Sequence, residues 1–237
     1  MQRRARPLLG TLVEIGAPLG HEAAFDAVAE LQARLSRFEP GSDIARFNAL
    51  PAGGALRVGA LATEVLTAAR RLQIDSEGLF DISLGSGPDA WRLDGDRLRK
   101  LAAGVVLDLG GIAKGQAVDV AVRALQDAGA AAGWVNAGGD LRVFGELELP
   151  IRLRDEAGGG VREFARLADG AFATSHYGLG TSSATTRAVQ AHISVVAPLC
   201  LWADALTKVV ALSGDCGHPL LARYDAAAWR HDVPRFA

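Results

Sequence analysis

Hydrophobic residues recur at every third or fourth position in several stretches of the chain, which is typical of helices that pack one face against a core. The clearest example runs from Glu22 to Phe38, where Phe25, Val28 and Leu31 share a face. The same pattern predicts further helices at 61–72, from Gly111 to a stop at Gly129, at 199–212 and at 220–229.

Short apolar or alternating stretches separate these helices and predict strands. They lie at 8–16, 80–85, 105–107, 134–141, 147–153, 161–167, 171–177 and 193–197. The charged residues at 94–99 indicate a turn between two short strands. No internal repeat and no linker composition divides the chain, so we expect a single domain over 1–237.

The net charge of the 237 residues is −2, and no basic surplus points to nucleic acid. Cys200 and Cys216 match no metal motif and no disulfide framework, so we expect free thiols on helices. The basic start of the chain resembles a signal peptide, but Gly10 and Glu14 break the short apolar run that follows it. No stretch approaches the length of a membrane span. We therefore expect a cytoplasmic protein.

The segment 105–119 combines an apolar run, a pair of glycines and the start of a helix. Gly110 and Gly111 permit a tight turn or the close approach of a ligand. The helix start offers unpaired N–H groups and a positive dipole end, and Lys114 adds a positive charge. The spacing matches neither a Walker A loop nor G-x-G-x-x-G. Two interpretations stay open: a phosphate site, or a tight turn beside a solvated lysine.

Two more glycine turns follow predicted strands, at Gly10–Thr11 and Gly138–Gly139. Paired glycines inside a sheet usually mark a bulge or a backbone that something approaches closely. Together with Lys114, these turns suggest a crevice for an extended phosphorylated ligand.

Three polar residues have both a structural and a functional interpretation. Ser42 and Asn48 suit the cap of a short helix and a turn, and a role in binding is the alternative. Asp204 lies in an apolar helix, where a carboxylate is rarely left unpaired. It would either hold a hard cation such as Mg²⁺ together with a phosphate, or form an i,i+4 ion pair with Lys208.

Seven motifs, in order along nearly the whole chain, resemble those of the ApbE family, the FAD:protein FMN transferases. The most specific are DLGGIAKGQAVD at 108–119 and NAGGD at 136–140. The others are Leu9-Gly10-Thr11, the segment 36–48, FDISLG at 80–85 with Trp91 downstream, Thr174-Ser175 and the Ala-Asp-Ala-Leu of 203–206.

The resemblance implies an α+β fold in which mixed sheets and flanking helices surround one flavin cleft. It also implies that the protein binds FAD and Mg²⁺, cleaves the pyrophosphate and moves FMN to a Thr or Ser hydroxyl of a target flavoprotein. AMP leaves. Such a transfer at phosphorus rests on positioning and charge neutralisation.

The resemblance also carries the family's ligand contacts onto this chain. Mg²⁺ would be held at Ala113, Asp204 and Thr207. The positions implied for FAD are Gly10, Thr11, Ser42, Asn48, Asp81, Ser83, Gly110, Gly111, Lys114, Asp119, Gly138, Gly139, Thr174, Ser175 and Lys208.

The sequence departs from the family pattern after Thr174-Ser175. The family has an H-I-I-D-P-x-T-G segment there, and its histidine is the implied general base for the target hydroxyl. This chain has only 178–190 in that interval and no Asp-Pro. His192 is one candidate replacement and His176 is another, although a lone histidine at a strand end is more often structural. Without a base, FAD binding would survive and transfer would be impaired.

Lys208 is a second departure, because the family has a metal-binding Thr four residues after the aspartate. Here Thr207 stands one residue early. An ammonium group beside Asp204 would repel Mg²⁺, or would take the place of the cation against the pyrophosphate. The metal is therefore doubtful, and we hypothesise that Lys208 weakens or replaces it.

Three functions stay open at this point. The leading one is a flavin transferase, which needs a base and a cation. The second is a catalytically impaired relative that binds flavin nucleotide and acts as a binding or maturation factor. It needs only the glycine turns, Asn48 and the cleft. The third is a structural member whose side chains fill the cleft.

Overall fold

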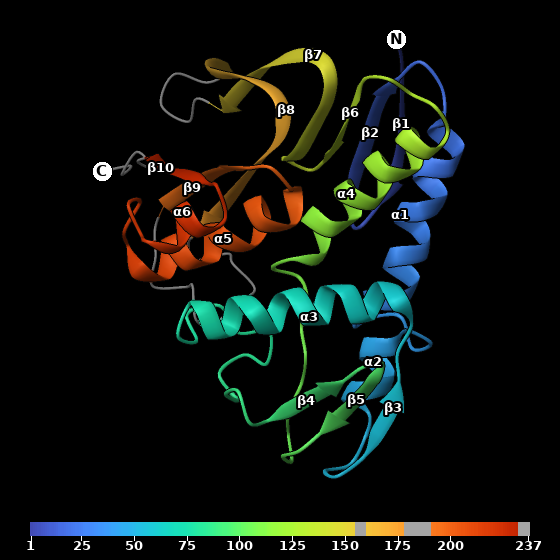
Figure 1. The fold of residues 1–237 in the computed structure, drawn as a ribbon, viewed down its shortest axis with the longest axis vertical. Helices are drawn as coiled ribbons and strands as arrows, with labels where there is room; N and C mark the ends of the chain where they lie inside the picture. The colour runs from blue at the N-terminus through green and yellow to red at the C-terminus, as the bar shows by residue number, and fades with distance from the viewer. Residues whose placement is uncertain (155–159, 178–190, 232–237) are drawn as a thin grey trace.

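The computed structural model describes residues 1–154, 160–177 and 191–231, which form two sheets and six helices (Figure 1). The larger sheet has the strand order β1-β2-β6-β7-β8-β9-β10, and each neighbouring pair is antiparallel. The smaller sheet has the order β3-β5-β4. The strands are β1 Gln2–Leu8, β2 Thr11–Ala17, β3 Ala55–Arg57, β4 Trp91–Asp94, β5 Arg97–Lys100, β6 Gly133–Ala137, β7 Asp140–Arg154, β8 Val161–Tyr177, β9 Ala191–Ala197 and β10 Ala227–His231.

Helices flank both sheets, which confirms the expected α+β class. They are α1 His21–Leu35, α2 Asp43–Asn48, α3 Ala60–Asp75, α4 Ala113–Asp127, α5 Cys200–Ser213 and α6 Leu220–Arg223. In Figure 1, α4 and α5 lie in front of the larger sheet, α3 crosses below them, and the smaller sheet lies beyond α3. No helix among the described residues is long and apolar enough to cross a membrane.

The larger sheet separates two hydrophobic clusters. Ala173 and Tyr177 of β8 belong to the main core, which α4 and α5 cover. Phe172, one residue away, belongs to a second cluster on the opposite face. The pairing of β7 with β8 shifts register at two places, and Asp169 has a φ of 39°. Such bulges bend a hairpin, and Phe164 of β8 packs back against Phe172 with ring centroids 6.1 Å apart.

Most predicted elements are confirmed. The helices predicted at 22–38, at 61–72, from Gly111 to a stop at Gly129 and at 199–212 appear as α1, α3, α4 and α5, with ends displaced by a few residues. The strands at 147–153, 161–167, 171–177 and 193–197 lie within β7, β8 and β9. The stretch 134–141 divides into β6 and the start of β7. The turn predicted at 94–99 is present but shorter, since only 95–96 separate β4 from β5. The loop at 178–186 lies outside the described residues.

Two strand predictions are wrong, and a third is confirmed only in part. The stretch 8–16 is a strand from Thr11 onward, as β2, but its start holds a tight turn, because Leu9 and Gly10 have φ of 56° and 70°, and residues 2–8 form the partner strand β1. The stretch 80–85 is a turn organised by Asp81, whose carboxylate accepts hydrogen bonds from the N–H groups of Ser83 and Gly85. The stretch 105–107 is not in a sheet, because the side chain of Asn48 takes both backbone groups of Leu107.

The last predicted helix, 220–229, is also wrong. It ends after one turn as α6, and the chain continues as β10, which pairs with β9. Cys200 lies in α5 as expected, whereas Cys216 lies in a turn and not on a helix. Both cysteines are free thiols, as predicted.

Candidate functional site

The contact between α4 and α5 brings together two parts of the site that are far apart in the sequence. A Cβ atom at Gly115 would lie 2.2 Å from the carbonyl oxygen of Cys200, so only glycine allows this approach. Asp119 accepts hydrogen bonds from the N–H groups of Cys200 and Leu201 at 3.0 and 2.8 Å, and Arg142 of β7 pairs with it at 2.7 Å. Asp119, which the resemblance implied for FAD, therefore caps α5 and joins it to α4.

Four charged residues meet at this contact, and we call Lys114, Asp140, Asp204 and Lys208 the lysine–aspartate cluster. The Nζ atom of Lys114 lies 2.6 Å from Asp140 Oδ2. Lys208 Nζ pairs with Asp204 Oδ1, and the N–H of Gly115 donates to Asp204 Oδ2 at 3.1 Å. Both aspartates are fully buried. The i,i+4 ion pair that we gave as the alternative for Asp204 is therefore present.

The cluster shifts the pKa of each member. Burial would raise the pKa of Asp204, but the ammonium groups of Lys208 and Lys114 outweigh it and hold that pKa below its usual value. Burial would lower the pKa of Lys114, but Asp204 and Asp140 raise it. Burial would also lower the pKa of Lys208, but the charge of Asp204 outweighs it and raises that pKa. Burial and the charge of Asp204 raise the pKa of Asp140 to about 6.

A group of hydroxyls surrounds the pair of Asp204 and Lys208. Thr207 Oγ1 donates to the carbonyl of Asp204 at 2.7 Å and lies 2.8 Å from Ser175 Oγ and 3.0 Å from the Tyr177 hydroxyl. Lys208 Nζ donates to Ser175 Oγ at 3.3 Å. The structure therefore brings Thr207, Ser175 and Lys208 together, three residues that the sequence analysis singled out.

The glycine turns border the cluster. A Cβ atom at Gly111 would lie 3.3 Å from Lys208 Cε, so the lysine stem lies against the turn that precedes α4. At the other side, a Cβ atom at Gly138 would lie 2.6 Å from Thr11 Oγ1, so the Gly10–Thr11 and Gly138–Gly139 turns touch. Asp140, a member of the cluster, directly follows the Gly138–Gly139 turn, so this turn also borders the cluster.

Four other predicted residues have structural duties nearby. Ser42 caps α2 by accepting the N–H of Ala45 at 2.9 Å. Asn48 holds Leu107, and Ser83 Oγ donates to Asp81 Oδ1 at 2.6 Å. These contacts position the chain that leads to Gly110 and Gly111, because the N–H of Asp108 donates to Ile82 O at 2.8 Å. Gly110 itself donates to Asp108 Oδ1 at 2.8 Å.

The two histidines proposed as the base lie on the opposite face of the sheet from the lysine–aspartate cluster. His176 and His192 are directly paired across β8 and β9, with Nδ1 and Nε2 2.8 Å apart. They share the face of the second hydrophobic cluster, because β8 alternates and Tyr177 points into the main core. Thr174 lies on the same outer face, where its hydroxyl contacts Ser194 Oγ at 2.8 Å. None of these three side chains reaches the lysine–aspartate cluster.

The donor set does not fit Mg²⁺ at the positions that the resemblance implied. Thr207 Oγ1 has one proton and two lone pairs, and its three hydrogen bonds use all of them. Each oxygen of Asp204 already accepts a hydrogen bond, and the charges of two ammonium groups act on this carboxylate. Ala113 begins α4 beside them. Within 1–154, 160–177 and 191–231, no group of three His, Cys, Asp or Glu side chains could hold a metal.

Asp140 and Tyr177 are the site residues that our sequence reasoning missed. A signal for Asp140 was available, because it closes the NAGGD motif directly after two glycines. Its Oδ1 atom is buried and has no hydrogen-bond partner among the described residues.

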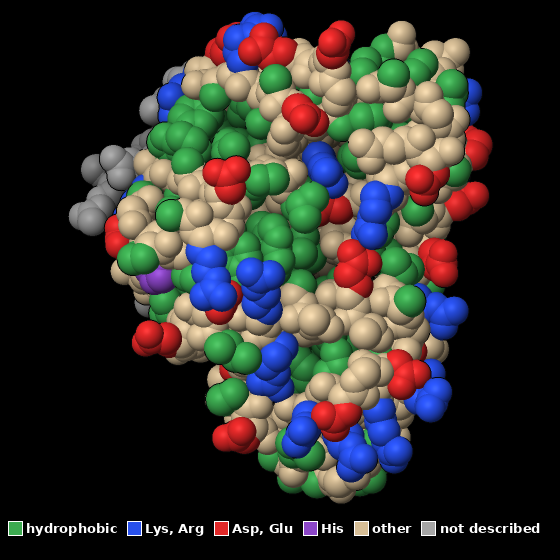
Figure 2. Space-filling model, viewed as in Figure 1, with side chains coloured by type: hydrophobic (Ala, Val, Ile, Leu, Met, Phe, Trp, Pro, Cys, Tyr) green, Lys and Arg blue, Asp and Glu red, His purple; other side chains and the backbone are tan. Residues whose placement is uncertain are grey.

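On the face drawn in Figure 2, Lys and Arg side chains flank a hydrophobic patch where α3, α4 and α5 meet.

Known proteins share this architecture. The model of the ApbE family matches residues 9–101 and 91–229. An FAD:protein FMN transferase of Rhodobacter capsulatus is 31% identical over a 177-residue alignment, and the match covers 59% of this chain and 34% of that protein. This chain thus spans about a third of that relative's length, given the 34% coverage.

Two solved structures have the same fold. The flavinyl transferase ApbE of Pseudomonas stutzeri superimposes with a TM-score of 0.79 at 24% identity, over 99% of this chain and 92% of that one. The flavin transferase ApbE of Vibrio cholerae gives 0.82 at 20% identity, over 97% and 93%. Since the family model covers nearly the whole sequence, this chain belongs to the ApbE family.

Proposed function

We propose that this protein is an FAD:protein FMN transferase, which moves FMN from FAD to a Thr or Ser hydroxyl of a target flavoprotein. Family membership and the curated relative of that name support the activity. The structural observation that carries the proposal is the ammonium group of Lys114 at the start of α4, beside the Gly110–Gly111 turn. A helix start with a lysine is suited to a pyrophosphate.

The reaction exchanges one phosphorus–oxygen bond for another. The target hydroxyl oxygen attacks the phosphorus of the FMN half, and the bond from that phosphorus to the bridging oxygen breaks. AMP leaves with the bridging oxygen and its electron pair, and the hydroxyl proton passes to the released phosphate or to solvent. Negative charge grows on the bridging oxygen, and Lys114, with a side chain 35% exposed, is positioned to stabilise it.

The exposed glycine turns suit the close approach of FAD to the main chain. A Cβ atom at Gly10 or Gly139 would meet no atom within 4 Å, so the backbone is uncovered at both turns. Charge neutralisation falls to the lysines, since Lys208 already pairs with Asp204 and the second Asp204 oxygen accepts the N–H of Gly115. No step is assigned to His176 or His192, which lie on the other face of the sheet.

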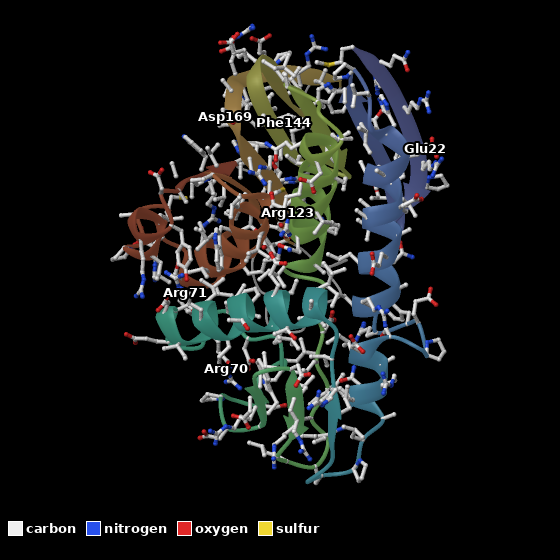
Figure 3. All side chains as sticks on the ribbon, turned by 45° about the vertical axis from the view of Figure 1, so that its right-hand side comes forward. Glu22, Arg70, Arg71, Arg123, Phe144 and Asp169 are labelled. Carbon is white, nitrogen blue, oxygen red and sulfur yellow. The ribbon has the colours of Figure 1, made fainter. Side chains whose placement is uncertain are left out.

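The test is to incubate the purified protein with FAD and a peptide that carries a target threonine, in EDTA and in MgCl₂. Released AMP and covalently bound flavin are measured together. We expect both products in equal amounts from the wild type, a large loss in Lys114→Met, and no loss in Arg123→Met. Arg123 is a matched control on the same helix, where it pairs with Glu64 of α3 at 3.0 Å (Figure 3). Intact FAD bound without AMP would instead favour the impaired binding protein.

A further inference from the structure

Lysine is rare in this chain, and every lysine is at least partly buried. Of the 25 basic residues, only Lys100, Lys114 and Lys208 are lysines, and the rest are arginines. Lys100 is 5% exposed, and the side chain of Lys208 is 19% exposed. An ammonium group is a compact charge with three donors, whereas a guanidinium group is a wide planar fork. The two lysines of the cluster therefore occupy positions that suit a small cation.

The Nζ atom of Lys208 has three oxygen neighbours of different kinds. They are the carboxylate Oδ1 of Asp204, the carbonyl of Asp204 at 3.0 Å and the hydroxyl of Ser175 at 3.3 Å. These contacts use all three N–H donors of the ammonium group. Carboxylate, carbonyl and hydroxyl oxygens are also the donors that hard metal cations take. The ammonium group therefore occupies a cation position that protein oxygens build.

A divalent ion would find few uncommitted ligands beside that ammonium group. The second oxygen of Asp204 already accepts the N–H of Gly115, and Thr207 Oγ1 has no free lone pair. Lys114 supplies a second positive charge close enough to shift the pKa of Asp204. Two ammonium groups this close to Asp204 would strongly repel a divalent ion in a buried site.

The same cation position borders the predicted anion site. The stem of Lys208 lies against the Gly111 turn, where a Cβ atom would be 3.3 Å from Lys208 Cε. Asp140 is the one hydrogen-bond partner of the Lys114 ammonium group within the described part of the chain, which leaves two of its donors for a phosphate. The two lysines thus supply two positive charges around the start of α4.

We infer that Lys208 is a resident cation that replaces a divalent metal at Asp204, so that the protein binds the pyrophosphate of FAD without Mg²⁺. Lys208 neutralises Asp204 from within the fold, and Lys114 faces the phosphates. The choice of FAD as the ligand rests on the proposed function, whereas the exclusion of a metal from Asp204 does not.

The first experiment titrates Mn²⁺ into the protein without FAD and follows the loss of the free-ion EPR signal. The variants are Lys208→Thr, which removes the ammonium group, and Arg123→Thr, which makes the same charge change on an exposed side chain. We expect a new Mn²⁺ site in Lys208→Thr, and none in the wild type or in Arg123→Thr. A wild-type site that disappears in Asp204→Asn would overturn the inference.

The second experiment measures FAD affinity by flavin fluorescence in EDTA and in MgCl₂. We expect the wild type to bind equally in both, and Lys208→Thr to bind about tenfold more weakly in EDTA, which is 1.4 kcal/mol. Wild-type binding that requires MgCl₂ would contradict the inference. If FAD binds under neither condition, the proposed function fails, while the Mn²⁺ titration still decides whether Lys208 excludes the metal. Should Lys208→Thr not fold, the Mn²⁺ titrations of the wild type and of Asp204→Asn decide it.

Discussion

Ser175 and His176 are consecutive residues of β8, and their side chains lie on opposite faces of the larger sheet. Ser175 faces α5 and lies 2.8 Å from Thr207 Oγ1, whereas His176 lies on the outer face with His192. One peptide bond thus separates a residue of the lysine–aspartate site from a residue that cannot reach it. We therefore expect the proton chemistry of the proposed transfer not to run through this histidine pair.

Replacing the histidines tests this arrangement directly. We expect His176→Ala and His192→Ala to keep the rate of FMN transfer within about twofold of the wild type, because neither ring faces the site. Ser175→Ala should lower the rate of FMN transfer more than either histidine variant does, because Lys208 and Thr207 each lose a hydrogen-bond partner. The rates are measured from covalent flavin on the target peptide. A large loss in either histidine variant, with normal stability, would show that the outer face takes part.

Lys208→Arg conserves the charge but not the shape of the cation. The three oxygen neighbours of Lys208 fit an ammonium group, and the larger guanidinium group would push them apart. We expect the free energy of unfolding to fall by about 1–3 kcal/mol, which is typical of overpacking. Urea denaturation measures it. The exposed Arg123→Lys is the control and should change stability by less than about 0.5 kcal/mol.

Gly115→Ala tests the contact between α4 and α5. Its Cβ atom would lie 2.2 Å from the carbonyl oxygen of Cys200, which is backbone and cannot rotate away. We expect a loss of about 2–3 kcal/mol in stability and weaker FAD binding, because the helices must separate. Gly41→Ala is the matched control, since a Cβ atom there would meet nothing within 4 Å. Equal effects at the two positions would refute the close contact.

The pH dependence of stability should show the titration of Asp140. Its pKa is raised to about 6 in the fold, above the value of about 3.9 in an unfolded chain. Protonation is therefore favoured by folding, so this contribution is complete below about pH 4 and is lost as the pH rises through about 6. The loss amounts to about 2–3 kcal/mol. Asp140→Asn cannot titrate, so its unfolding free energy, measured in urea, should not show this fall between pH 4 and 6. Parallel profiles for the two proteins would contradict the assignment.

The sequence predicted the helices well because each buries one face, and that spacing is visible in Phe25, Val28 and Leu31. It missed β1 because this edge strand is mostly exposed and carries arginines, which leave no hydrophobic signal. The stretch 105–107 has the pattern of a buried strand, because it is apolar and is buried at Val105 and Leu107. In the structure, however, a side chain makes the backbone hydrogen bonds that a neighbouring strand would make.

The site divides in the same way. The pair of Asp204 and Lys208 follows from helix geometry, since residues four apart share a face. The pair of Lys114 and Asp140 depends on the packing of α4 against β7, which no local pattern reveals. The position of His176 could have been predicted, because the alternation along β8 places it opposite Ser175.

The contact at Gly115 also bears on how a ligand enters. With the Cys200 carbonyl against Gly115, and with Asp119 holding the first N–H groups of α5, the two helices are expected to move as one rigid body. The spacing of Lys114 and Lys208 would then stay constant while other parts of the molecule shift. A nucleotide would then meet a preset pair of charges.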